Sequence, residues 1–221
     1  MSEQLERDVM EYDVLVIGGG PSGLSSAIKI KQLASKENKD ISVCVLEKGS
    51  EIGAHILSGN VFEPTALNEL FPDWKDKGAP LNTPATKDVV KFMISDSLSF
   101  NVPFPSFLIP TFNNHGNYIM SLANFTRWLG TQAESLGIEI FPGFTAAEII
   151  FEDNIVKGVL TGEMCISKDG EKKASYQPSM ELRGKYTIFA EGCRGHLGKQ
   201  LINKYNLEFR KFFLNNFIDI F

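Results

Sequence analysis

The chain has 221 residues, of which 43% are hydrophobic and 22% charged, a composition that suits one globular domain or one and a half. Its net charge is −5 and no basic run stands out, which argues against nucleic acid as a partner. Three scattered cysteines without a CxxC pair cannot by themselves hold zinc or an iron–sulfur cluster, so no metal ligands are expected.

The first predicted element is an apolar strand over residues 12–17, and a glycine-rich turn follows it directly. We assign Gly18 to the tight reversal of the chain and Gly20 to the close approach of backbone N–H groups to a pyrophosphate. Gly23 would let the next helix pack close to the strand. A glycine triplet alone is weak evidence, because turns use glycine freely.

A helix is predicted over residues 21–34, with Pro21 and Ser22 in its first turn and its dipole directed at the phosphates. A second apolar strand, residues 41–46, ends at Glu47, whose carboxylate can accept both ribose hydroxyls of an adenosine. The charge of Glu47 would repel a 2′-phosphate, so FAD or NAD fits better than NADP. Strand, turn, helix, strand and terminal acid in this order predict a dinucleotide site.

The loop after Glu47 supplies weaker candidates. Residues beside a flat flavin ring must be small, and this loop offers glycines at two places. An ordinary surface loop is the alternative. We assign no catalytic role to the histidine of this loop. The candidates are Gly53, Ala54, His55, Ser58 and Gly59.

Further elements follow in chain order. They are a short helix (64–70), two short strands (86–100), a proline-broken apolar stretch (103–112), a helix (118–136) and three strands (138–141, 145–151 and 155–160). The last two strands form a hairpin, where a plain NAD-binding domain would continue with another parallel strand and helix. The hairpin therefore favours the FAD-binding variant with a small antiparallel meander.

The final part begins with a polar excursion. The predicted elements are this excursion (167–177), a strand (181–182), a buried parallel strand (186–190) and a helix (196–205). Glu191 and Gly192 follow the buried strand as a second corner, which would fix a flavin cofactor near its diphosphate or ribityl chain. An acid at a helix N-terminus is an alternative compatible with that role.

Several stretches resemble the electron-transfer flavoprotein–ubiquinone oxidoreductase family. The likeness runs from about residue 12 to residue 207 and is far more specific than a glycine triplet. The stretches are EKGSEIGAHILSG (47–59), LFPDWK (70–75), KGAPLNTP (77–84), NNHGNYI (113–119) and FAEGCRGHL (189–197). Residues 208–221 do not resemble the family.

The resemblance implies FAD-dependent electron transfer from reduced electron-transfer flavoprotein to ubiquinone. It adds Lys48 to the cofactor residues and gives no residue a catalytic or metal-binding role. It also implies a [4Fe–4S] cluster, whose cysteine ligands lie in a C-terminal region absent from these residues. Family members lie on the membrane surface without a transmembrane helix. The polar N-terminus, lacking a transit-peptide pattern, favours the cytoplasmic face of a bacterial inner membrane, or the mitochondrial inner membrane if eukaryotic.

The predicted fold is α/β: an FAD/NAD(P)-binding Rossmann-like three-layer fold with an antiparallel β-meander, truncated at the C-terminus. We expect an N-terminal portion of a longer enzyme. Another FAD oxidoreductase of the same fold (prenyl reductase or hydroxylase type) and an inactive FAD- or ADP-binding fragment are the alternatives. The expected parts are an FAD-binding first part (1–84), inserted strands and apolar loop facing quinone or membrane (85–117), the continued FAD-binding domain (118–207) and an atypical tail (208–221).

Overall fold

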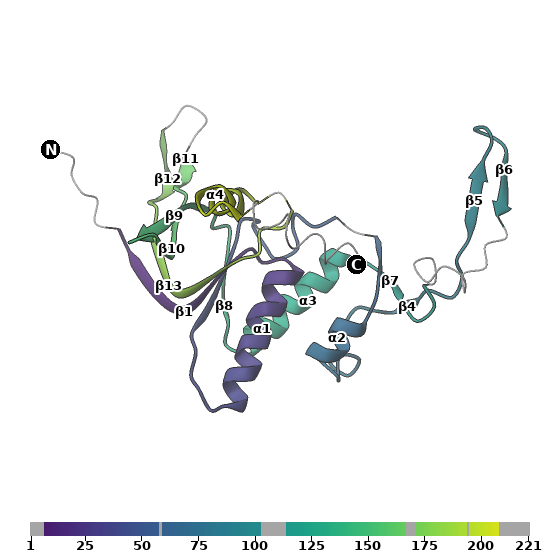
Figure 1. The fold of residues 1–221 in the computed structure, drawn as a ribbon, viewed down its shortest axis with the longest axis horizontal. Helices are drawn as coiled ribbons and strands as arrows, with labels where there is room; N and C mark the ends of the chain where they lie inside the picture. Colours follow the sequence, from purple (N-terminus) through teal and green to yellow (C-terminus); the bar gives the residue numbers. More distant parts are fainter. Residues whose placement is uncertain (1–6, 58, 103–113, 167–170, 194, 208–221) are drawn as a thin grey trace. The chain divides into compact units, whose positions relative to one another are not determined.

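The structure is a computed structural model that describes residues 7–57, 59–102, 114–166, 171–193 and 195–207 (Figure 1). The predicted apolar loop 103–112, the tail 208–221 and Ser58 lie outside the described residues. The chain forms two compact units. Unit 1 comprises Met1–His55 and Leu129–Phe221, and unit 2 comprises Ile56–Trp128. The four-part division expected from the sequence stays a prediction.

Unit 1 contains a six-stranded sheet (Figure 1). Its order is β8 (Glu139–Pro142), β2 (Val43–Glu47), β1 (Val9–Ile17), β13 (Glu181–Phe189), β10 (Ile155–Thr161) and β9 (Ala146–Glu152). The first four strands are parallel, whereas β10 and β9 are antiparallel to their neighbours. The strands β1 and β2 read as apolar runs because central parallel strands are covered on both faces.

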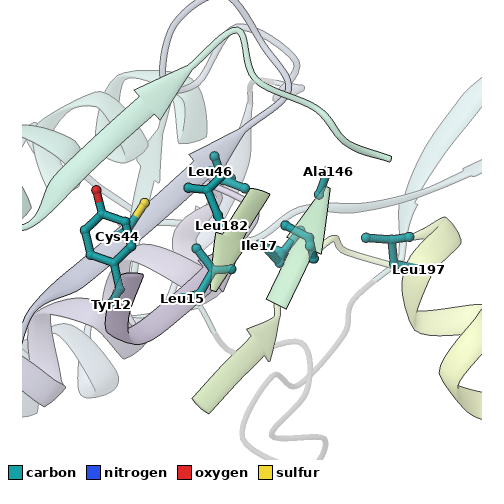
Figure 2. Packing of buried hydrophobic residues seen from close by; sticks show 9 residues of the cluster. Tyr12, Leu15, Ile17, Cys44, Leu46, Ala146, Leu182 and Leu197 are labelled. Atoms are coloured by element: carbon teal, nitrogen blue, oxygen red, sulfur yellow. The ribbon is translucent and has the colours of Figure 1, made fainter. Parts of the chain in front are cut away.

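Helices cover both faces of this sheet. On one face α1 (Pro21–Lys36) packs against Val16 of β1. On the other face, Leu197 of α4 (His196–Lys204) joins the main hydrophobic cluster (Figure 2). The buried members of that cluster are Tyr12, Leu15, Ile17, Cys44, Leu46, Ala146, Val159, Leu182 and Leu197. The predicted three-layer α/β fold is therefore confirmed.

The predicted antiparallel hairpin is β9 and β10. Its turn residues Asp153 and Asn154 have φ of 48° and 65°, as a two-residue type I′ turn requires. The prediction of a polar excursion over residues 167–177 was only partly right, because part of this segment forms a strand. Within it β12 (Lys172–Gln177) pairs with β11 (Met164–Ile166) as a second hairpin, because charged side chains suit a strand that is exposed on a two-stranded ribbon.

Two further boundaries differ from the sequence prediction. The runs at 181–182 and 186–190 are one strand, β13, because it pairs with β1 along its whole length. Tyr186 in this strand is 74% exposed rather than buried. The predicted helix 118–136 starts later: β7 (Tyr118–Met120) comes first, and α3 (Leu122–Ser135) follows. The Ser121 hydroxyl accepts the backbone N–H of Asn124 (3.4 Å), an N-cap signal that the sequence already contained.

Unit 2 is a small mixed unit. It contains a three-stranded sheet of β3 (Asn60–Phe62), β7 and β4 (Thr83–Pro84), and the predicted short helix α2 (Thr65–Leu70). The two predicted short strands are β5 (Val90–Met93) and β6 (Ser99–Val102), which pair as a hairpin. Aromatic side chains form its core. Phe71, Trp74 and Phe125 are buried, and the Trp74 indole donates to Asn68 Oδ1 (2.7 Å), which satisfies its polar atom.

Candidate cofactor site

The carboxyl ends of three parallel strands meet at one edge of the unit 1 sheet. Gly18, just after β1, donates its N–H to the carbonyl of Leu46 at the end of β2 (2.8 Å). Ala190, just after β13, donates its N–H to the carbonyl of Ile17 (2.8 Å). In open α/β sheets, ligands bind outside the carboxyl ends of strands, so this edge is the candidate site.

Gly18 and Gly23 are required by the packing of the chain itself. Gly18 has φ of +112°, and a Cβ there would lie 2.4 Å from the carbonyl oxygen of Ala190. A Cβ on Gly23 would lie 2.0 Å from the carbonyl oxygen of Gly18. Side chains at either position would force strand, turn and helix apart, as expected for a tight turn and a closely packed helix.

Gly20 lies in open space. A Cβ on Gly20 would meet no atom within 4 Å, and its φ of −78° and ψ of 178° suit any residue. It is the N-cap of α1, which has no side-chain cap, and Pro21 and Ser22 start the helix without an acid in its first turn. Within the described residues, no side chain caps the first turn of α1, so its N–H groups remain available to an anion.

Glu47 lies half-buried beside this turn, at the end of β2. One carboxylate oxygen accepts the N–H of Gly19 (2.9 Å), and the other accepts the N–H of Gly49 (2.6 Å). A carboxylate has about four acceptor positions, so each oxygen keeps room for another donor, such as a ribose hydroxyl. The sequence did not predict that Gly19 and Gly49 donate their N–H groups to Glu47, although both glycines lie in glycine-bearing segments, the turn after β1 and the loop after β2.

The second corner has a different geometry. Glu191 accepts the N–H groups of Gly198 (2.8 Å) and Leu197 (3.4 Å) in the first turn of α4, and its side chain is 13% exposed. His196 Nδ1 lies 3.4 Å from the same carboxylate. An acid of the chain therefore already caps the first turn of α4, whereas no side chain caps that of α1. A role of Glu191 toward the flavin stays a prediction.

Replacing Glu191 by alanine should destabilise unit 1. The substitution removes two hydrogen bonds to the orphan N–H groups of α4, and losing such a cap costs roughly 0.5–2 kcal/mol. The free energy of unfolding, measured by urea denaturation, should fall accordingly. Glu148, an exposed acid on β9, supplies the control, since Glu148→Ala should change it by less than about 0.5 kcal/mol. Equal effects of the two variants would contradict the capping role.

The remaining predicted residues are spread more widely. Gly53 is buried in the turn after β2, while Lys48, Ala54 and His55 are exposed there. Gly192 is exposed beside Glu191. Gly59 belongs to unit 2. The structure thus brings the diphosphate turn, Glu47 and the Glu191 corner to one sheet edge, and the roles of all these residues remain predictions.

Cys44 behaves as a small apolar residue. It is fully buried, and its burial raises the pKa of the thiol to about 12, so the reactive thiolate is absent near neutral pH. Among the residues that the structure describes, no three His, Cys, Asp or Glu side chains gather as a metal ion would need. No helix within the described ranges is long and apolar enough to cross a membrane.

These features define the class of protein: an α/β chain with the FAD/NAD(P)-binding Rossmann-like fold. A family described as an NAD(P)-binding Rossmann-like domain matches residues 16–84. A geranylgeranyl bacteriochlorophyll reductase-like protein of Thermoplasma acidophilum superimposes with a TM-score of 0.59 at 22% identity, covering 86% of this chain and 42% of its own. The myxobacterial FAD-dependent halogenase CndH superimposes with a TM-score of 0.56 at 16% identity. The match covers 87% of this chain and 39% of the halogenase. These likenesses show the fold.

The sequence relatives are more specific. The chain is 58% identical over 207 residues to the probable electron transfer flavoprotein-ubiquinone oxidoreductase of Acinetobacter baylyi, covering 92% of this chain and 36% of that protein. The mitochondrial electron transfer flavoprotein-ubiquinone oxidoreductase of Homo sapiens is 51% identical. The match covers 92% of this chain and 33% of the human protein. The resemblance read from the sequence is thereby confirmed. The chain matches the N-terminal part of these oxidoreductases and spans about a third of their length.

Proposed function

We propose that this chain binds FAD and takes part in electron transfer from reduced electron-transfer flavoprotein to ubiquinone. The observation that carries the proposal is the 58% identity, over 92% of the chain, to a relative with that name. FAD supplies chemistry suited to this task, because a flavin can hold one or two electrons and so match a one-electron donor to a two-electron acceptor. The site would be at a membrane surface, either the cytoplasmic face of a bacterial inner membrane or the mitochondrial inner membrane.

The chain's own residues would hold the cofactor by its adenosine diphosphate half. The N–H groups at the start of α1 would donate to the diphosphate, which Gly20 lets approach closely. Glu47 would accept the ribose hydroxyls with its remaining lone pairs. Around the flavin the proposal places small or polar residues of the loop after β2 and of the second corner, namely Lys48, Gly53, Ala54, His55, Ser58, Gly59, Glu191 and Gly192.

The [4Fe–4S] cluster of the family is no part of this proposal. A cubane cluster needs four cysteine ligands, and this sequence contains three cysteines. Cys44 is buried in the sheet, while Cys165 and Cys193 are exposed. The residues present therefore do not fit the cluster, and no electron-transfer step is assigned to it here.

An exposed apolar surface in unit 2 supports the membrane part of the proposal. It lies on the β5–β6 hairpin, where five large apolar side chains are between 50% and 60% exposed. They are Phe92, Met93, Ile94, Leu98 and Phe100. Clustered apolar side chains on one small element mark an interaction surface such as a lipid interface.

Replacing Phe92 and Phe100 together by serine should weaken binding to phosphatidylcholine vesicles. The two rings form a cross-strand pair with centroids 5.5 Å apart, and burying each is worth roughly 1.5–3 kcal/mol. The vesicle partition coefficient, measured by co-sedimentation, should fall by at least roughly 100-fold. Asn101→Ser, on the opposite side of β6, should leave it unchanged. If the double variant sediments as the unsubstituted chain does, the hairpin is not the lipid-binding element.

The proposed function is tested on the purified chain in two assays. Titration with FAD, followed by tryptophan fluorescence and by the flavin absorption spectrum, measures the cofactor site. Stopped-flow mixing of the FAD-loaded chain with reduced electron-transfer flavoprotein measures electron acceptance, and a soluble ubiquinone analogue then measures delivery. Saturable FAD binding and reduction by the flavoprotein would support the proposal. A folded chain that binds no FAD would overturn it, and FAD binding without reduction would overturn its electron-transfer part.

A further inference from the structure

Ile52 packs against the backbone of two glycines that lie far apart in the sequence. A Cβ on Gly19 would lie 2.5 Å from Ile52 Cδ1, and a Cβ on Gly130 of α3 would lie 3.3 Å from Ile52 Cγ2. Such separations mean that the isoleucine fills the space a side chain at either position would need. The Ile52 side chain thus packs between the glycine-rich turn (18–23) and α3. Gly19, Ile52 and Gly130 all belong to unit 1.

The loop that carries Ile52 is fixed at its start as well. Gly49 donates its N–H to Glu47 Oε1 (2.6 Å), and its carbonyl accepts the N–H of Gly143 at the end of β8 (2.7 Å). A Cβ on Gly49 would lie 3.0 Å from the same carboxylate oxygen. The loop is therefore held by hydrogen bonds at Gly49 and by packing at Ile52, and this loop leads to the predicted flavin-side residues.

Gly19 connects Ile52 to the ribose-binding candidate. Gly19 contacts Ile52 by packing and donates its N–H to Glu47 Oε2 (2.9 Å). A displacement of Ile52 would free Gly19 to move, and Glu47 would then lose one of the two bonds that orient its carboxylate. Orientation matters because a charge-assisted hydrogen bond to a ribose hydroxyl depends on distance and angle.

We propose that Ile52 is a positioning residue for the dinucleotide site: by packing on Gly19 it keeps the Glu47 carboxylate directed at the ribose. The proposal rests on the proposed function, since it concerns the same nucleotide. Ile52 acts through Gly19 and Glu47 and is given no contact with the cofactor. The sequence offered no signal for it, because an isoleucine in a glycine-bearing loop has no motif of its own.

A double-mutant cycle on the full chain tests the contact. Gly19→Ala should raise the dissociation constant of ADP, measured by calorimetry, roughly tenfold, because the new methyl group would lie 2.5 Å from Ile52 Cδ1 and 3.1 Å from Glu47 Cβ and Oε2. In an Ile52→Val background, which lacks Cδ1, only the looser contact with Glu47 remains, and the same change should raise the dissociation constant by no more than about threefold. Equal factors in the two backgrounds would show that Ile52 and Gly19 act independently and would overturn the proposal.

A second measurement does not depend on the folding of the Gly19 variant. Preference for ADP over 2′,5′-ADP reports how the Glu47 carboxylate is directed, because the added phosphate is repelled by it. Ile52→Ala should reduce this preference by at least about threefold, and Ile52→Val, which lacks only the Cδ1 atom that packs on Gly19, should reduce it less. Ile149→Ala removes a partly buried isoleucine that packs on the hydrophobic cluster. It should lower the melting temperature and leave the preference intact.

The outcomes separate this inference from the proposed function. If the unsubstituted chain binds neither ADP nor FAD, the proposed function fails and the positioning role fails with it. If it binds both and Ile52→Ala keeps the full preference for ADP, only the positioning role of Ile52 is overturned. A reduced preference in Ile52→Ala, a smaller reduction in Ile52→Val and retention in Ile149→Ala would support it.

Discussion

Substituting Gly20 by alanine should abolish tight FAD binding without destabilising the fold. The methyl group would meet no protein atom within 4 Å, and the backbone angles suit alanine. It would occupy the space through which a diphosphate approaches the N–H groups of α1. Losing one or two charge-assisted hydrogen bonds of about 1.5–3 kcal/mol each corresponds to roughly a 100-fold weaker complex. Calorimetric titration with FAD and with ADP measures the loss.

The contrast with Gly23 makes this test decisive. A methyl group on Gly23 would lie 2.0 Å from the carbonyl oxygen of Gly18, and overpacking of this kind costs roughly 1–3 kcal/mol. Gly23→Ala should therefore lower the melting temperature by roughly 2–12 °C, whereas Gly20→Ala should leave it unchanged. If Gly20→Ala keeps full affinity for both nucleotides, the diphosphate does not lie at this turn.

Much of the fold was predictable because local pattern and tertiary context agree. The apolar runs of β1 and β2, the helix α1 between them and the β9–β10 hairpin were all expected, and each is explained by its own sequence. The errors occurred where pairing partners decided the outcome. Nothing local in residues 181–189 shows that the strand is continuous, because its glycine and lysine suggest a break that pairing with β1 overrides.

The candidate site was predictable only in outline. The sequence made the turn and Glu47 candidates because dinucleotide binding needs glycine and a carboxylate at set positions, and the structure brings both to one sheet edge. It did not reveal that Glu47 also accepts the N–H groups of Gly19 and Gly49, since such bonds join backbone atoms that carry no residue signature. The sequence allowed two roles for Glu191, a flavin-binding corner or an acid at a helix N-terminus. The structure shows its carboxylate accepting an N–H group in the first turn of α4.

Replacing Glu47 is expected to have the second large effect, because Glu47 accepts two backbone N–H groups and is proposed to bind the ribose as well. In the structure each oxygen accepts one backbone N–H and has room for one more donor. Alanine would remove all of these bonds. Glutamine would keep one acceptor oxygen but replace the other by an NH₂ group, which cannot accept from a backbone N–H. The two variants therefore separate the loss of charge from the loss of the side chain.

Glu47→Ala should weaken ADP and FAD binding roughly 100-fold, since it deletes charge-assisted bonds of about 1.5–3 kcal/mol each. Glu47→Gln should bind ADP more weakly as well, yet it should gain relative affinity for 2′,5′-ADP. Two like charges about 4 Å apart repel by roughly 1–4 kcal/mol, and the amide removes that repulsion. Calorimetry with both nucleotides measures the ratio of the affinities for ADP and 2′,5′-ADP.

Glu37→Gln makes the same change of net charge at an exposed site just past α1 and should leave this ratio unchanged. An unaltered ratio in Glu47→Gln would mean that this carboxylate does not face the ribose, and the adenosine would then have to lie elsewhere on the sheet edge.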